Sequence, residues 1–181
     1  MRGRAERHRP PEGENVSKAF ALGFGVFYLA VGLIGFTVTG FTGFTAETKE
    51  ELLGFDLNVF HNIVHLTIGL ALVLASTLKD ETVTQGVVIG VGLFYIVAAV
   101  LGFANYLQII SIDASLVIDN FFHLISGSAA LAFGLLGAQR QHRSLRESGS
   151  LEETGSLPQA SAASGARGPL PIEERRQMWD R

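Results

Sequence analysis

Four apolar stretches, each about as long as a membrane-spanning helix, follow one another along the chain. They cover residues 19–38, 58–78, 83–104 and 115–138. A helix needs about 20 apolar residues to cross the hydrocarbon core of a bilayer, because each residue adds about 1.5 Å of length. The pattern therefore predicts an all-α integral membrane protein that forms a four-helix bundle.

Three connections join these stretches. Residues 39–57 form the longest connection, in which Thr45 is expected to cap a short turn that continues to Glu51. Residues 79–81 form a tight polar connection, so the second and third helices should be antiparallel neighbours. Residues 105–114 link the third helix to the fourth.

The two ends of the chain are polar and enclose one membrane domain, residues 19–138. Both termini are expected to be disordered: residues 1–18 form a polar cytoplasmic leader, and residues 139–181 form a cytoplasmic tail whose composition cannot offset the entropy lost on ordering. A basic leader before an apolar run is also typical of a signal peptide. However, residues 19–38 are longer than a usual signal core and lack a clear cleavage site, so we expect this helix to be retained.

Composition agrees with a membrane protein. Of the 181 residues, 48% are hydrophobic and only 17% are charged, below the quarter that is usual in soluble domains. The net charge of −3 and the lack of a basic stripe with interleaved aromatics argue against nucleic-acid binding. The chain has no cysteine, which excludes disulfides and thiolate metal sites.

The lysine and arginine residues predict the orientation. They gather in the leader, at Lys79 and at the start of the tail, whereas the connection 39–57 contains only Lys49 and the connection 105–114 contains none. Basic flanks remain on the cytoplasmic side of a membrane. We therefore expect a multi-pass protein of the plasma membrane with both termini in the cytoplasm.

The sequence also contains an internal repeat. The pattern Asn-x-x-His-Leu-x-x-Gly occurs at residues 62–69 and again at residues 120–127, and residues 23–28 resemble residues 90–95. The first two helices thus correspond to the last two in the same order. This predicts two parallel two-helix repeats related by a pseudo-two-fold axis along the membrane normal.

Small residues are expected to let the helices approach closely, since packing and hydrogen bonds drive helix association in lipid. The expected packing positions are Gly86, Gly90, Ser126, Ala130, Gly134 and Ala138.

Polar side chains within the apolar stretches are the candidate functional residues. They are Tyr28, Asn62, His65, Tyr95, Asn120 and His123. The repeat would place His65 and His123 at one depth, facing a shared axis. Such groups are costly inside a membrane and usually face the bundle interior. We favour a polar clamp, in which each neutral imidazole bonds an Asn, Thr or Tyr across the bundle and the protein has a structural or interaction role. The alternative is a pocket at His65 and His123, open to the outer face, that binds or transports a small molecule or ion.

A metal or haem redox protein is a third hypothesis. His61 and His65 are spaced i,i+4, as are Asp119 and His123, and imidazole with carboxylate suits zinc or iron. Alternatively, His65 and His123 could be the axial ligands of one haem. Because i,i+4 spacing recurs by chance and no extended metal motif is present, we do not favour this hypothesis and expect no cofactor.

An enzyme is not expected either, since the sequence shows no set of nucleophile, base and orienting group and no phosphate-binding loop. The lipid bilayer is the expected partner, and the sequence leaves open a homo-oligomer or contact with another membrane protein.

Residues 57–69 and 119–124, which contain the two Asn-x-x-His motifs, resemble a family of small prokaryotic four-span membrane proteins known as a domain of unknown function. The resemblance covers residues 18–138 and implies the four-span topology and the membrane location. It implies no catalytic residues. Asn58 has Leu116 at its equivalent position in the second half, so the two halves are not equivalent there.

Overall fold

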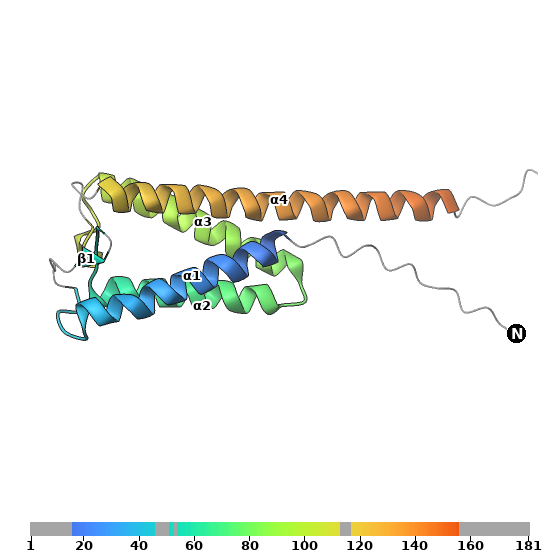
Figure 1. Ribbon diagram of the computed structural model, residues 1–181. Helices are drawn as coiled ribbons and strands as arrows, with labels where there is room; N and C mark the ends of the chain where they lie inside the picture. The colour runs from blue at the N-terminus through green and yellow to red at the C-terminus, as the bar shows by residue number, and fades with distance from the viewer. Residues whose placement is uncertain (1–15, 46–50, 53, 113–116, 156–181) are drawn as a thin grey trace, which may run out of the picture. The chain divides into compact units, whose positions relative to one another are not determined.

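Four long helices make up most of the structure. The computed structural model describes residues 16–45, 51–52, 54–112 and 117–155. The helices are α1 (Val16–Thr39), α2 (Val59–Thr77), α3 (Glu81–Phe103) and α4 (Val117–Gly155) (Figure 1). Each is long and apolar enough to cross a membrane. The predicted all-α, four-span architecture is confirmed.

Two polar side chains begin the central helices. Asn58 caps α2 by accepting a hydrogen bond from the backbone N–H of His61 at 2.8 Å, and Asp80 caps α3 by accepting one from Thr82 at the same distance. Such caps satisfy donors that have no partner within the helix. Only three residues, 78–80, separate α2 from α3. This agrees with the tight antiparallel connection predicted there.

Glycines set the distance between α1 and α2. A Cβ atom added at Gly25 would lie 2.9 Å from the carbonyl oxygen of Gly69, and one added at Gly69 would lie 2.7 Å from the backbone nitrogen of Leu29. The two helices therefore pack backbone against backbone. The α3–α4 pair has the same kind of contact, since a Cβ at Gly92 would lie 2.9 Å from the carbonyl oxygen of Gly127.

The predicted packing positions are right for α4 and wrong for α3. Ser126, Ala130 and Gly134 are buried, and Ala138 is half-buried. In contrast, Gly86 and Gly90 are exposed, and an added Cβ would meet nothing within 4 Å at either position. The sequence contains several glycines along this helix, and spacing alone did not reveal that Gly92 faces α4.

The long connection after α1 contains a short hairpin that the sequence did not predict. Strand β1 (Glu51–Leu52) pairs antiparallel with β2 (Phe55–Asp56). Strands of two residues are too short to show an alternating hydrophobic pattern. The turn expected after Thr45 falls on residues 46–50, which lie outside the described residues. Between α3 and α4 the chain forms a 3₁₀ turn, η1 (Gln108–Ile110).

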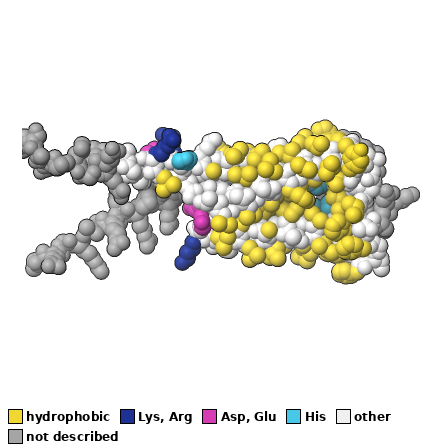
Figure 2. All heavy atoms as spheres, turned by 180° about the vertical axis from the view of Figure 1, so that it is seen from behind, with side chains coloured by type: hydrophobic (Ala, Val, Ile, Leu, Met, Phe, Trp, Pro, Cys, Tyr) yellow, Lys and Arg dark blue, Asp and Glu magenta, His cyan; other side chains and the backbone are white. Residues whose placement is uncertain are grey.

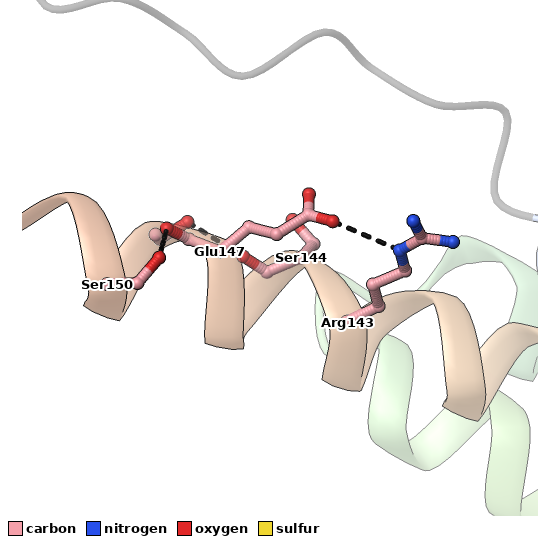
Figure 3. Close-up of polar contacts among 5 residues, drawn as sticks. Arg143, Ser144, Glu147 and Ser150 are labelled. Carbon is pink, nitrogen blue, oxygen red and sulfur yellow. Dashed lines mark hydrogen bonds and ion pairs between the residues drawn. The ribbon is translucent and has the colours of Figure 1, made fainter.

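The fourth helix continues beyond the predicted apolar span. It ends at Gly155 rather than near residue 138, which corrects the expectation that disorder begins at residue 139. Its polar part, residues 142–155, belongs to a unit separate from the helix bundle. An i,i+4 ion pair joins Arg143 and Glu147 at 3.0 Å, as Figure 3 shows. Residues 1–15 and 156–181, where disorder was also expected, lie outside the described residues.

Apolar side chains cover the surface of the helix bundle. Leu33, Leu74, Val100 and Ile125 are each more than half exposed. Figure 2 shows hydrophobic side chains across the drawn face, without Lys, Arg, Asp or Glu inside the band. A surface of this kind is costly in water and favourable against lipid.

Candidate functional site

Buried polar side chains gather at the end of the bundle where α2 and α4 begin. The most buried of them are Asn58, His61, Asn62, His65, Asp119, Asn120 and His123. In each helix these positions recur at a spacing of three or four residues, which places them on one face. Buried polar groups are thus concentrated near the starts of both helices.

Three histidines meet in this cluster. The ring centroids of His61 and His65 are 4.4 Å apart, and that of His123 lies 5.9 Å from His61 and 6.4 Å from His65. One ring nitrogen from each histidine can be chosen so that all three lie within 4.8 Å of one another. Their exposed fractions are 1%, 6% and 4% in chain order. We refer to these residues as the three-histidine cluster.

Asp119 orients one of the three rings. The Nδ1 atom of His123 lies 3.0 Å from a carboxylate oxygen of Asp119 and 2.9 Å from its main-chain carbonyl oxygen. A neutral imidazole that donates from Nδ1 keeps a lone pair on Nε2. Asp119 therefore presents Nε2 of His123 as an acceptor or ligand. The carboxylate itself lies beside the three-histidine cluster and is not one of its members.

The other two histidines leave ring nitrogens available. Within the described part of the chain, neither ring nitrogen of His61 nor Nδ1 of His65 forms a hydrogen bond of good geometry. The backbone of Asp56 and of Ile110 approaches the His61 ring. Buried polar atoms normally have a partner. Ring nitrogens without such a bond, at the centre of a cluster, are able to bind a ligand.

The asparagines of the repeated motif face elsewhere. Asn62 donates a hydrogen bond from Nδ2 to the hydroxyl of Thr39 on α1 at 2.8 Å, and its side chain lies where a Cβ of Gly35 would be. Asn120 in turn occupies the space beside Gly102 on α3. The asparagines of the motif therefore join each helix to its partner.

Two tyrosines separate the histidines from the rest of the bundle. The rings of Tyr28 and Tyr95 stack with their centroids 5.1 Å apart. Tyr28 also lies 5.1 Å from the ring of His65, and Tyr95 lies 5.2 Å from that of His123. The Tyr28 hydroxyl lies near Ser126 and Tyr95. This aromatic layer forms one wall of the histidine cluster.

A cavity of about 90 Å³ adjoins the cluster. Its lining residues are His61, Val64, His65, Phe94, Tyr95, Val97, Ala98, Leu101, Leu107, Ile110 and His123. Phe94 and Val97 are each more than half exposed, so the cavity has a rim on the apolar surface of α3. On the face drawn in Figure 2, histidine side chains are visible through a gap in the hydrophobic band.

The volume limits what this cavity can hold. Drug-sized ligands occupy pockets of about 300–1,000 Å³, and a cavity of about 150 Å³ is enough for benzene. A space of about 90 Å³ suits an ion with a bound water or a molecule of a few atoms. A haem held between His65 and His123 is too large for it.

Comparison with known proteins assigns the chain to a family. Residues 18–136 match the family described as "Domain of unknown function (DUF4383)". The chain belongs to this family. The match spans all four apolar segments and both Asn-x-x-His motifs, as the sequence resemblance implied. No curated protein and no solved structure matches the chain.

Sequence reasoning missed part of the site of this DUF4383 protein. Asn58 caps α2 and donates a hydrogen bond from Nδ2 to the carbonyl oxygen of Ile109 at 3.0 Å, which holds η1 over the cavity. An asparagine directly before an apolar run is a recognisable cap signal. The contribution of Leu107 and Ile110 to the lining has no comparable signal, because it depends on how the connection folds back.

Proposed function

We propose that this multi-pass membrane protein binds a small ligand, an ion or a molecule of a few atoms, in the cavity beside the three-histidine cluster. The observation that supports ligand binding most strongly is the orientation of the three imidazole rings. They face one another and the cavity, while the asparagines make the contacts between helices. A clamp alone would not need three histidines in one place.

Binding rather than catalysis is the proposed role, in agreement with the expectation from the sequence. The cavity lies at the end of the bundle formed by η1 and the starts of α2 and α4. With both termini in the cytoplasm of a plasma-membrane protein, this end would face outward. A ligand would then reach the cavity from outside the cell.

The test compares a variant that fills the cavity with a matched control. Ala98→Leu places an isobutyl group in the cavity, whereas Ala71→Leu adds the same group at an exposed position of α2. Protein purified from the host membrane is measured by native mass spectrometry. We expect a bound species on the natural protein and on Ala71→Leu, and its loss from Ala98→Leu.

Two results would contradict the proposal. One is a natural protein that carries no bound species while remaining folded. The other is an Ala98→Leu protein that retains the same species in the same amount, since the ligand would then lie elsewhere.

A structural role is the second candidate, and one observation favours it. Asn62 bonds Thr39 between α1 and α2, while Asn58 joins α2 to the connection before α4. We infer that the clamp consists of the asparagines. It holds the helices that carry the histidines, so the two roles are compatible.

We also infer that the two halves are an internal repeat. Gly25 faces Gly69 as Gly92 faces Gly127, and these four glycines occupy equivalent positions of the repeated sequence. The pairs Tyr28–His65 and Tyr95–His123, at 5.1 and 5.2 Å, support the same inference.

A further inference from the structure

We infer that the three-histidine cluster is a site for one divalent transition-metal ion of the zinc type. The inference deepens the proposed function, on which it rests, by naming the class of ligand. It follows from the donor set, from the orientation of one ring, from the balance of charge and from the space beside the ring nitrogens.

The donor set consists of three imidazoles. Nitrogen ligands of this kind suit zinc, copper, nickel and iron, whereas calcium and magnesium prefer oxygen. In a tetrahedral zinc site with Zn–N distances of about 2.0–2.1 Å, ligand nitrogens are about 3.4 Å apart. The three nitrogens lie within 4.8 Å of one another. Metal binding would draw the three nitrogens closer together by rotation of the imidazole side chains.

The orientation of His123 is the second support. A histidine that binds a metal through one nitrogen usually donates its other N–H to a carboxylate or a backbone carbonyl. The Nδ1 atom of His123 has both, from the same residue, at 3.0 and 2.9 Å. Asp119 is therefore a positioning residue that leaves Nε2 of His123 as the nitrogen available to a metal.

Charge is the third support. Asp119 is 1% exposed, and its second carboxylate oxygen, Oδ2, has no hydrogen-bond partner among the described residues. A buried carboxylate is costly unless a cation is near it. The first turns of α2 and α4 point the positive ends of their dipoles at this region, but a dipole end equals about half a charge. A divalent cation on three neutral imidazoles offsets the carboxylate more completely.

The cavity supplies the remaining coordination position. Three protein ligands with an open fourth position are typical of sites where a metal binds water or a small exchangeable group. The three histidines line one cavity of about 90 Å³, which has room for such a group. The site would therefore hold a metal with one exchangeable ligand rather than a fully enclosed ion.

Metal titration of the full-length protein tests the inference. The protein is purified in detergent without a histidine tag, treated with EDTA and titrated with Co²⁺ and with Zn²⁺. We expect one metal per chain, a visible absorption spectrum for tetrahedral Co²⁺, its loss on addition of Zn²⁺, and a rise in Tm with Zn²⁺ that Mg²⁺ does not produce.

Variants identify the ligands. His65→Gln and His123→Gln, which keep hydrogen-bonding groups, should abolish stoichiometric binding. Asp119→Asn should weaken binding by about 10- to 100-fold, and Asp119→Glu should recover part of this loss. His142→Ala is the matched control, because His142 is an exposed histidine outside the cluster, and it should bind like the natural protein.

The outcomes are distinguishable. Absence of Co²⁺ absorption and of a Zn²⁺-dependent Tm rise in the natural protein overturns the inference without any variant, as does unchanged binding in His65→Gln and His123→Gln. If the metal site fails while native mass spectrometry still detects an organic species that Ala98→Leu loses, the proposed function stands. If both measurements are negative, the proposed function fails as well.

Discussion

Asn62 and His65 stand three residues apart but make contacts in different directions. Three helical residues turn the chain by about 300°, so the two side chains point about 60° apart. This difference directs Asn62 to Thr39 and Gly35 on α1, while His65 faces Tyr28 and His123. The difference in direction thus lets Asn62 take part in helix packing while His65 takes part in the candidate site.

The hydrogen bond between Asn62 and Thr39 should contribute modestly to stability. Asn62→Ala and Thr39→Ala should each lower the unfolding free energy in detergent by about 0.6 kcal/mol, and by no more than about 1.7 kcal/mol. The double variant should lose little more than either single variant, because the same bond is removed. Thr67→Ala is the control, since its hydroxyl bonds only its own helix at an exposed position. Additive losses in the double variant would show that the two residues do not interact.

The sequence patterns identified most residues of the site, but they did not predict which of these residues contact one another. The repeated motif pointed to His65 and His123, because polar groups within an apolar run are conspicuous. His61 entered the sequence analysis only as a possible metal ligand through its i,i+4 spacing with His65, because a polar residue in the first turn of a helix is ordinary. Its approach to His123 depends on how α2 and α4 pack, and hydrophobic periodicity does not specify which helices are neighbours.

At the scale of the helices, the apolar runs predicted the spans to within about three residues at most ends. The stretches predicted at residues 19–38 and 83–104 correspond to helices Val16–Thr39 and Glu81–Phe103. The end of α4 was not predicted, because its polar part has no apolar stripe. That part is rich in good helix formers and contains the ion pair Arg143–Glu147, which stabilises a helix without burial.

Gly92 and Gly90 provide a test of the close contact between α3 and α4. Gly92→Ala should destabilise the protein by about 1–3 kcal/mol, because the added Cβ would meet the backbone of Leu131 and Gly127. Gly90→Ala, two residues away at an exposed position, should be neutral or stabilising by up to about 1 kcal/mol. The measurement is thermal or denaturant unfolding in detergent. An equal effect of the two substitutions would contradict the backbone-to-backbone contact.

At the scale of the whole membrane domain, the polar cluster and Lys79 lie at opposite ends of α2. The cavity lies where η1 and the starts of α2 and α4 meet, and Asn58 holds η1 there through the carbonyl of Ile109. Lys79 lies in the connection between α2 and α3, at the other end of α2. The two Asn-x-x-His motifs therefore lie on the same side of the membrane domain.

The orientation of the domain decides whether that side meets the outside of the cell. Because basic flanks stay in the cytoplasm, we predict that Asp80 faces inward and Lys49 outward. Single cysteines can be introduced cleanly, since the chain has none, and the unmodified protein is the control. In intact cells, an impermeant thiol reagent should label Lys49→Cys and leave Asp80→Cys unlabelled until the membrane is opened. The reverse pattern would place the three-histidine cluster near the cytoplasm, and its ligand would then have to come from inside the cell.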